Sequence, residues 1–161
     1  MPELSPKPRV ALGSDHAGFP IKETLRQFLQ NAGYPVDDLG TWSEESVDYP
    51  DYGKAVGECV AARKDVFGIA VCGTGMGISI AANKVRGIRA AVAHDVSTAR
   101  LAREHNDANV LALGGRVVNG SQAIEMVQAF LNTSFLGGRH ARRVEKITMI
   151  EQDEGKKNDC W

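Results

Sequence analysis

The sequence predicts a single α/β domain in which a five-stranded parallel sheet is doubly wound, with helices on both faces. Short apolar runs alternate with stretches of helical spacing along almost the whole chain of 161 residues. Such alternation favours parallel strands joined by right-handed crossover helices. The length suits one domain with one core, and no internal repeat or low-complexity block interrupts the pattern.

Five apolar runs have the length of strands, and most of them end at Gly, Ser, Asp or His. They are residues 10–12, 36–39, 68–71, 90–93 and 110–113. Between them apolar residues recur at the spacing of one helix face. The clearest cases are Ile21, Leu25, Phe28 and Leu29; Ala55, Val56, Cys59 and Val60; and Ile124, Val127 and Leu131.

The ends of the chain are expected to lie outside this domain. Residues 1–8 form an N-terminal extension, residues 9–151 the domain, and residues 152–161 a polar, frayed C-terminal tail. The last helical pattern of the domain, around residues 144–148, is expected to pack on the domain or on a partner chain.

Composition and charge exclude several classes of function. The net charge is −1, so nothing draws the chain to nucleic acid or to an anionic membrane. The start lacks the apolar segment of a signal peptide, and no apolar run could span a bilayer. Three cysteines, Cys59, Cys72 and Cys160, make an odd count that favours reduced thiols. We therefore expect a cytoplasmic protein.

Ligands of an open parallel sheet bind beyond the carboxyl ends of the strands, near the point where the strand order reverses. That rule singles out residues 13–18, 72–77, 94–95 and 114–116. The second of these loops contains Gly73, Gly75 and Gly77, which allow a tight turn with N–H groups facing an anion. The helix that follows points its positive end at the same place. Anion binding is favoured over the alternative, tight packing of helix on strand.

Cys72 closes the third predicted strand directly before this loop. A lone cysteine at a strand end is commonly a small buried apolar residue, and Cys59, on an apolar helix face, is interpreted in that way. Helix N-termini and neighbouring N–H donors favour a reactive thiolate. Position alone therefore leaves Cys72 evenly balanced between a functional thiol and a packing one.

The histidines differ in how strongly their positions indicate a function. Asp15 and His16 combine a carboxylate and an imidazole, which suits proton transfer, unless Asp15 caps the following helix. His105 lies late in a predicted helix, where a single histidine is more often a surface or packing residue. His94 and Asp95 are either a second polar pair or a helix cap. None of the histidines has the spacing of a zinc site, so no metal is predicted.

A dense basic group follows two glycines at residues 137–138 and contains Arg139, His140, Arg142 and Arg143. Arg139 and Arg143 are spaced to share one helix face, where two guanidinium groups can fork onto a phosphate. A solvated basic face paired with nearby glutamates is an equally well supported alternative.

Taken together, these residues resemble the type B ribose-5-phosphate isomerases, a family that also contains galactose-6-phosphate isomerase subunits. The resemblance covers about residues 9–151 in one continuous order. It is carried by residues 13–18, 40–42, 48–50, 72–79, 81–84, 87–90, 103–107, 113–116 and 138–140. It implies a Rossmann-like domain, no cofactor, and a homodimer or dimer of dimers whose active sites are shared between two chains.

The resemblance also implies roles for individual residues. Cys72 is the base that takes the proton from C2 of an open-chain aldose, and Thr74 assists it. Asp15 and His105 handle ring opening and the hydroxyl protons. His16 and the two arginines hold the phosphate, with the arginines reaching in from the second chain. The full set of implied substrate- and phosphate-binding residues is His16, Tyr49, Gly73, Gly75, Met76, Gly77, Asn106, Arg116, Arg139 and Arg143.

One branch of the family has a glutamate base immediately after the glycine loop. Here that position is Ile78, which cannot accept a proton, so the resemblance implies that Cys72 is the base. Two alternatives remain: an isomerase of galactose or allose 6-phosphate, and a sugar-phosphate-binding sensor without catalysis. A sensor needs no base, so the presence of Cys72, Thr74 and His105 argues against it.

Overall fold

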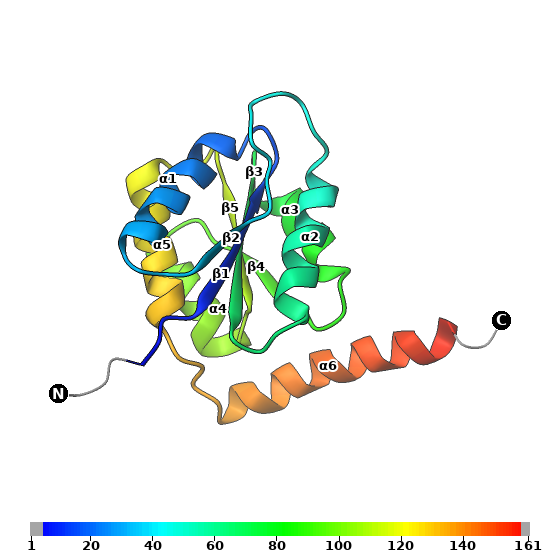
Figure 1. The fold of residues 1–161 in the computed structure, drawn as a ribbon. Helices are drawn as coiled ribbons and strands as arrows, with labels where there is room; N and C mark the ends of the chain where they lie inside the picture. Colours follow the sequence, from blue (N-terminus) through cyan, green and yellow to red (C-terminus); the bar gives the residue numbers. More distant parts are fainter. Residues whose placement is uncertain (1–4, 159–161) are drawn as a thin grey trace.

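The computed structural model describes residues 5–158 and contains the predicted parallel sheet (Figure 1). Its strands are β1 (Arg9–Ser14), β2 (Val36–Asp38), β3 (Val66–Cys72), β4 (Ala90–Val92) and β5 (Val110–Gly114), in the order β2-β1-β3-β5-β4. All pairings are parallel. The five predicted strands are confirmed, with ends displaced by one or two residues.

Helices cover both faces of the sheet, as a doubly wound Rossmann-like domain requires (Figure 1). One face carries α1 (Phe19–Asn31), α4 (Val96–Asn106) and α5 (Gly120–Asn132), and the other carries α2 (Tyr49–Ala61) and α3 (Met76–Asn83). Each face has its own buried core. Side chains alternate between the two cores along each strand. Val71 therefore joins the first core and Cys72 the second, on the side of α2 and α3.

The strand order reverses between β1 and β3, because the chain passes outward from β1 to β2 and then crosses back to β3. Ser14 at the end of β1 pairs with Val71 of β3, and Cys72 pairs with Gly114 at the end of β5. The loops after these three strands therefore meet at what we call the carboxyl edge of the sheet. The opposite edge, where the strands begin, is the amino edge.

Helix α6 (Arg139–Asn158) lies outside these two layers. It starts beside the end of α4, crosses the amino edge and runs away from the body of the domain (Figure 1). The frayed tail expected from residue 152 is wrong as far as Asn158, because the helix continues to that residue. Cys160 lies outside the described residues. None of the helices between residues 5 and 158 has the length and apolar character needed to cross a membrane.

Candidate active site

The glycine loop wraps its backbone around the thiol of Cys72. Cys72 is 4% exposed at the last position of β3, and the N–H of Gly75 donates to its Sγ at 3.2 Å. Gly75 has a φ of +83°, and a Cβ there would lie 3.0 Å from the backbone carbon of Leu113. Only glycine fits this turn, which brings an N–H donor to the sulfur.

Polar and aromatic side chains surround this loop at the carboxyl edge. The N–H of Arg116 donates to the carbonyl of Gly73 at 3.0 Å, and a Cβ on Gly73 would lie 3.0 Å from the Arg116 guanidinium. A Cβ on Gly77 would lie 2.7 Å from the Tyr49 ring. Thr74 and Met76, which follow Cys72, are exposed, and the N–H of Met76 donates to Thr74 Oγ1 at 3.3 Å. A ligand that reaches the thiol therefore meets these groups as well.

The loop after β1 brings Asp15 and His16 to the same edge. The N–H of Asp15 donates to the carbonyl of Val71, directly before Cys72, at 3.1 Å. Asp15 is 6% exposed, and its Oδ1 accepts from the N–H of Gly18 at 3.0 Å. The carboxylate therefore stabilises the turn that leads into α1. The N-cap residue is Gly18, so Asp15 does not cap the helix itself but holds the residue that does.

His16 is anchored through one ring nitrogen. Its Nδ1 lies 3.1 Å from the backbone nitrogen and 3.2 Å from the carbonyl oxygen of Val47. The first contact suits a ring without hydrogen on Nδ1 and the second a ring with it, so either tautomer keeps the anchor. Nε2 stays available for a ligand oxygen.

The remaining predicted residues lie at the amino edge, away from Cys72. His105 and Asn106 end α4, which runs opposite to the strands and reaches the amino edge just before β5. Arg139 and Arg143 are exposed on the first turns of α6, beside the end of α4. Within residues 5–158 neither arginine forms an ion pair, so the paired basic face considered from the sequence is absent there.

A stacked pair of imidazoles joins α4 to α6. The rings of His105 and His140 lie 4.2 Å apart between centroids, at an interplanar angle of 11°. Burial lowers the pKa of His140 below its ordinary value, and the nearby positive charges of His105, Arg139 and Arg143 lower it further. The stack therefore favours an uncharged His140.

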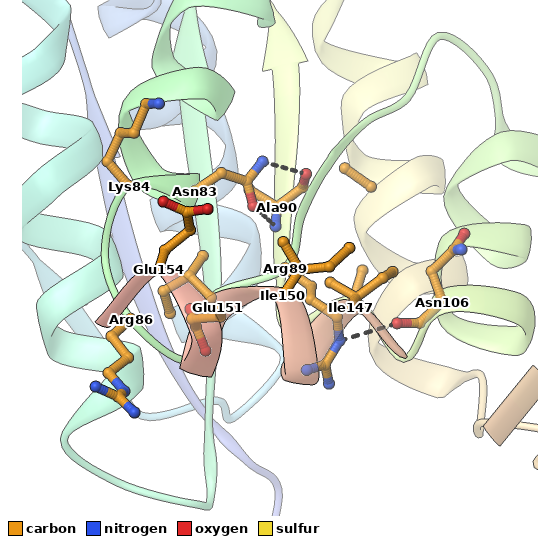
Figure 2. A pocket seen from close by; sticks show the side chains of 13 residues that line it. Asn83, Lys84, Arg86, Arg89, Ala90, Asn106, Ile147, Ile150, Glu151 and Glu154 are labelled. Atoms are coloured by element: carbon orange, nitrogen blue, oxygen red, sulfur yellow. Dashed lines mark hydrogen bonds between the residues drawn. The ribbon is translucent and has the colours of Figure 1, made fainter. Parts of the chain in front are cut away.

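A cavity of about 780 Å³ lies between α6 and the amino edge, as Figure 2 shows. Its lining includes Arg89 and Asn106 from the domain and Ile147, Ile150 and Glu151 from α6. Glu151 closes one side, since its Oε1 accepts from the N–H of Gly87 at 2.9 Å. The cavity adjoins His105 through Asn106 and is at the opposite edge from Cys72.

The alternative left open by the sequence for His94 and Asp95 is decided by contacts, and the surroundings of Cys59 are also defined. Asp95 is a helix cap: its Oδ1 accepts from the N–H of Thr98 at 2.7 Å, and this contact lowers the pKa of Asp95. Cys59 is half-buried 4.0 Å from Oδ2 of Asp37, and burial together with that charge raises the pKa of its thiol. In residues 5–158 no three His, Cys, Asp or Glu side chains gather as a metal site requires.

Sequence reasoning missed the anchors of this arrangement. The backbone of Val47 that holds His16, and the stacking of His140 on His105, join residues far apart in the chain. No local pattern indicates either contact. The direction of α4 did carry a usable signal, because a residue just before a strand must lie at the amino edge.

Comparison with known proteins identifies close relatives over nearly the whole chain. The family model described as Ribose/Galactose Isomerase matches residues 10–147. Ribose-5-phosphate isomerase B of Escherichia coli is 50% identical over 144 residues, which cover 89% of this chain and 97% of that protein. The structure of ribose-5-phosphate isomerase B from Clostridium thermocellum is similar with a TM-score of 0.89 and 53% identity, covering 91% of this chain and 99% of that one. The enzyme from Mycoplasma genitalium, solved with bound ribulose 5-phosphate, has a TM-score of 0.86 and 40% identity, covering 89% of this chain and 96% of that one.

Proposed function

The chain belongs to the ribose/galactose isomerase family, and we propose that it interconverts ribose 5-phosphate and ribulose 5-phosphate through an enediolate, with Cys72 as the base and without a cofactor. The relatives named above support the reaction, and the ligand of the Mycoplasma genitalium enzyme supports the substrate. The observation that carries the mechanism is the thiol of Cys72, which accepts the Gly75 N–H at 3.2 Å.

The proton transfer follows from the groups at the carboxyl edge. The Cys72 thiolate takes the proton from C2 of the open-chain aldose, and the electron pair moves toward O1 to give an enediolate. N–H groups of the glycine loop stabilise that charge as it develops. The thiol then returns the proton to C1, while a hydroxyl proton passes from O2 to O1 with Thr74 beside the reacting carbons. The product is the ketose, and the thiolate is restored.

Ring opening and phosphate binding use residues from both edges. Asp15 and His105 exchange protons with the ring oxygen and the C1 hydroxyl, and His16, Arg139 and Arg143 hold the phosphate dianion. Tyr49, Arg116 and Asn106 line the same pocket. His105, Asn106 and the two arginines lie at the amino edge of their own chain, so a complete site needs these residues from a second copy.

A two-fold homodimer, alone or paired into a dimer of dimers, meets that need. It brings the carboxyl edge of each chain to the amino edge of the other, which completes two equivalent sites. Exposed apolar residues on α6, Ile147, Met149 and Ile150, give such an interface an apolar component.

The assay that tests the function mixes the purified chain with ribose 5-phosphate and measures ribulose 5-phosphate. Full activity is expected after treatment with a metal chelator. Parallel assays with galactose and allose 6-phosphate test the hexose alternative, and pentose turnover should be the faster. Binding of ribulose 5-phosphate without any turnover would instead indicate a sensor.

We place this reaction in the cytoplasm. The support is that Cys59 and Cys72 are free thiols, which a reducing compartment such as the cytoplasm keeps reduced. Fractionation of cells, followed by detection of the chain with an antibody, tests the location.

A further inference from the structure

The chain turns sharply directly after His105 and Asn106. Asp107 ends α4 in the left-handed conformation, with φ +46° and ψ +41°, and it is the sole non-glycine residue between residues 5 and 158 with a positive φ. The N–H of Ala108 donates back to the carbonyl of Ala102 at 3.0 Å, as in a Schellman motif. Glycine usually occupies this position because it adopts the conformation without strain. An aspartate here suggests that its carboxylate has a use.

Two arginines from different elements bind that carboxylate. Nη1 of Arg103 donates to Oδ1 of Asp107 at 2.8 Å and to the carbonyl of Ala108 at 2.7 Å. Nη2 of Arg89 lies 3.4 Å from Oδ2 of Asp107 and 2.9 Å from its carbonyl oxygen. Nε of Arg89 donates to the carbonyl of Asn106 at 3.0 Å, a contact drawn as a dashed line in Figure 2. We call Arg89, Arg103 and Asp107 the arginine clamp.

The clamp is fixed to the core of the domain. Arg103 is 8% exposed, and its guanidinium lies 4.8 Å from the centre of the Phe67 ring and 5.8 Å from that of Phe130. Arg89 directly precedes β4, and its N–H donates to Oδ1 of Asn109 at 2.8 Å. Helix ends ordinarily fray because their last carbonyls lack partners. Here those carbonyls are bound by cations that suit the negative end of the helix.

We propose that Arg89, Arg103 and Asp107 are positioning residues, which hold His105 and Asn106 at the amino edge in the orientation that ring opening requires. The inference rests on the proposed function. His105 must reach a sugar held largely by another chain, and a displacement of about 1 Å in such a group lowers a rate by about 10²-fold. A glycine at position 107 would end the helix equally well, but it would leave the turn without its ionic anchor.

The test separates ring opening from proton transfer. Ribose 5-phosphate is mainly a closed furanose and must be opened. Ribulose 5-phosphate is open-chain, because its C5 oxygen carries the phosphate and closes no furanose ring. Uptake of deuterium from deuterated water into C1 of ribulose 5-phosphate, followed by NMR, therefore measures the Cys72 step alone. Turnover of ribose 5-phosphate measures opening and proton transfer together.

Asp107→Gly keeps the left-handed turn and removes the anchor. We expect its turnover of ribose 5-phosphate to fall by about ten- to a hundredfold, with deuterium uptake within about twofold of the wild type. Arg89→Met should behave in the same way, and Arg89→Lys should recover part of the loss, because an ammonium still binds the helix carbonyls. Arg100→Met is the matched control, since Arg100 is on the same helix and pairs at the surface with Glu104, at 3.8 Å. It should leave both measurements unchanged.

Two results would overturn the proposal. One is wild-type turnover of ribose 5-phosphate in both Asp107→Gly and Arg89→Met. The other is an equal loss of ribose 5-phosphate turnover and of deuterium uptake. That result would show that the clamp stabilises the whole fold and does not position His105 in particular. A variant that fails to fold counts as this second result. Failure of the proposed function is distinguishable, because the wild-type chain would then show neither reaction.

Discussion

Cys72 and Cys59 are both free thiols at the α2 side of the sheet, yet the groups beside the two sulfurs differ. Sγ of Cys72 accepts an N–H from Gly75, whereas Cys59 faces the carboxylate of Asp37, which together with burial raises its pKa. A hydrogen-bond donor stabilises a thiolate, and a nearby negative charge opposes it. The two residues therefore form a matched pair for mutagenesis.

Cys72→Ala should abolish turnover and leave binding largely intact, because the thiolate is needed for proton transfer and contributes little to holding the substrate. A positioned base is worth about 10²–10⁴-fold in rate. Steady-state turnover and calorimetric binding of ribulose 5-phosphate measure the two effects, and Cys59→Ala should change neither. A Cys72→Ala enzyme that keeps more than about a tenth of its rate would exclude this residue as the base.

At the scale of single elements, the first turns of α6 carry the arginines proposed to hold the phosphate, and His140 in the same turns stacks on His105 of α4. Helical geometry separates Arg139 and Arg143 from Arg142, which is rotated by about 100° from Arg143. All three side chains are exposed and have the same chemistry. Differences among their variants would therefore report geometry.

Arg139→Ala and Arg143→Ala should each raise the Michaelis constant for ribose 5-phosphate by roughly tenfold to a hundredfold, with a smaller fall in turnover. The reason is the loss of one charged hydrogen-bond partner of the phosphate, worth about 1.5–3 kcal/mol. Arg→Lys should restore part of the affinity, since an ammonium lacks the bidentate fork. Steady-state kinetics with Arg142→Ala as control make the measurement. If Arg142→Ala raises the Michaelis constant and neither Arg139→Ala nor Arg143→Ala does, this placement of the phosphate is refuted.

The contact between α6 and α4 should weaken in acid. Burial and neighbouring positive charge hold the pKa of folded His140 below the ordinary value of 6.5, so unfolded His140 binds a proton more readily. The contribution of uncharged His140 to the free energy of unfolding is therefore fully present above about pH 6.5. It is lost as the pH falls toward the lower pKa of His140 in the folded state. His140→Phe keeps an aromatic ring without titration and should flatten the fall in unfolding midpoint between about pH 7 and pH 5.

His94→Phe is the control for this experiment, because His94 is exposed and has no place in the stack. It should retain the pH dependence of the wild type. An unfolding midpoint that falls equally in the wild type and in His140→Phe would show that other groups cause the acid sensitivity.

At the scale of the whole molecule, much of the architecture was available from sequence periodicity. Parallel strands with apolar residues on both sides form continuous apolar runs, so all five strands were predictable. Because ligands bind where the strand order reverses, the sequence also predicts that Cys72, Asp15 and His16 lie at one edge of the sheet. The position of His105 just before β5 places it at the opposite, amino edge, which the resemblance by itself does not indicate.

Contacts between distant segments were not predictable. The clamp needs Arg89, Arg103 and Asp107 at one point, and the stack needs His140 on His105, whereas periodicity reports only neighbours within one element. The polar end of α6 was not predictable either, because residues 152–158 lack an apolar stripe and include Gly155, yet the helix continues through them to Asn158.

The proposed sharing of each active site between two chains leads to a complementation test. In a two-fold dimer, a site joins the carboxyl edge of one chain to the amino edge of the other. A Cys72→Ala homodimer then lacks the base in both sites, and an Arg139→Ala/Arg143→Ala homodimer lacks the phosphate arginines in both. A hybrid of the two variants has one site with both defects and one site with none. Random reassociation of equal amounts yields about half hybrids, so roughly a quarter of wild-type activity should return when the substrate is kept well below the raised Michaelis constant of the arginine variant.

Gel filtration should first show that each variant is at least a dimer, and differently tagged chains should confirm that hybrids form. Mixing Cys72→Ala with Thr74→Ala is the matched control, since both changes lie at the carboxyl edge and every hybrid site then carries one of them. No recovery is expected there. If confirmed hybrids of the base and arginine variants stay inactive, or a monomer has full activity, the amino-edge residues do not act across an interface. The phosphate would then have to be held by His16 and the glycine loop at the carboxyl edge of a single chain.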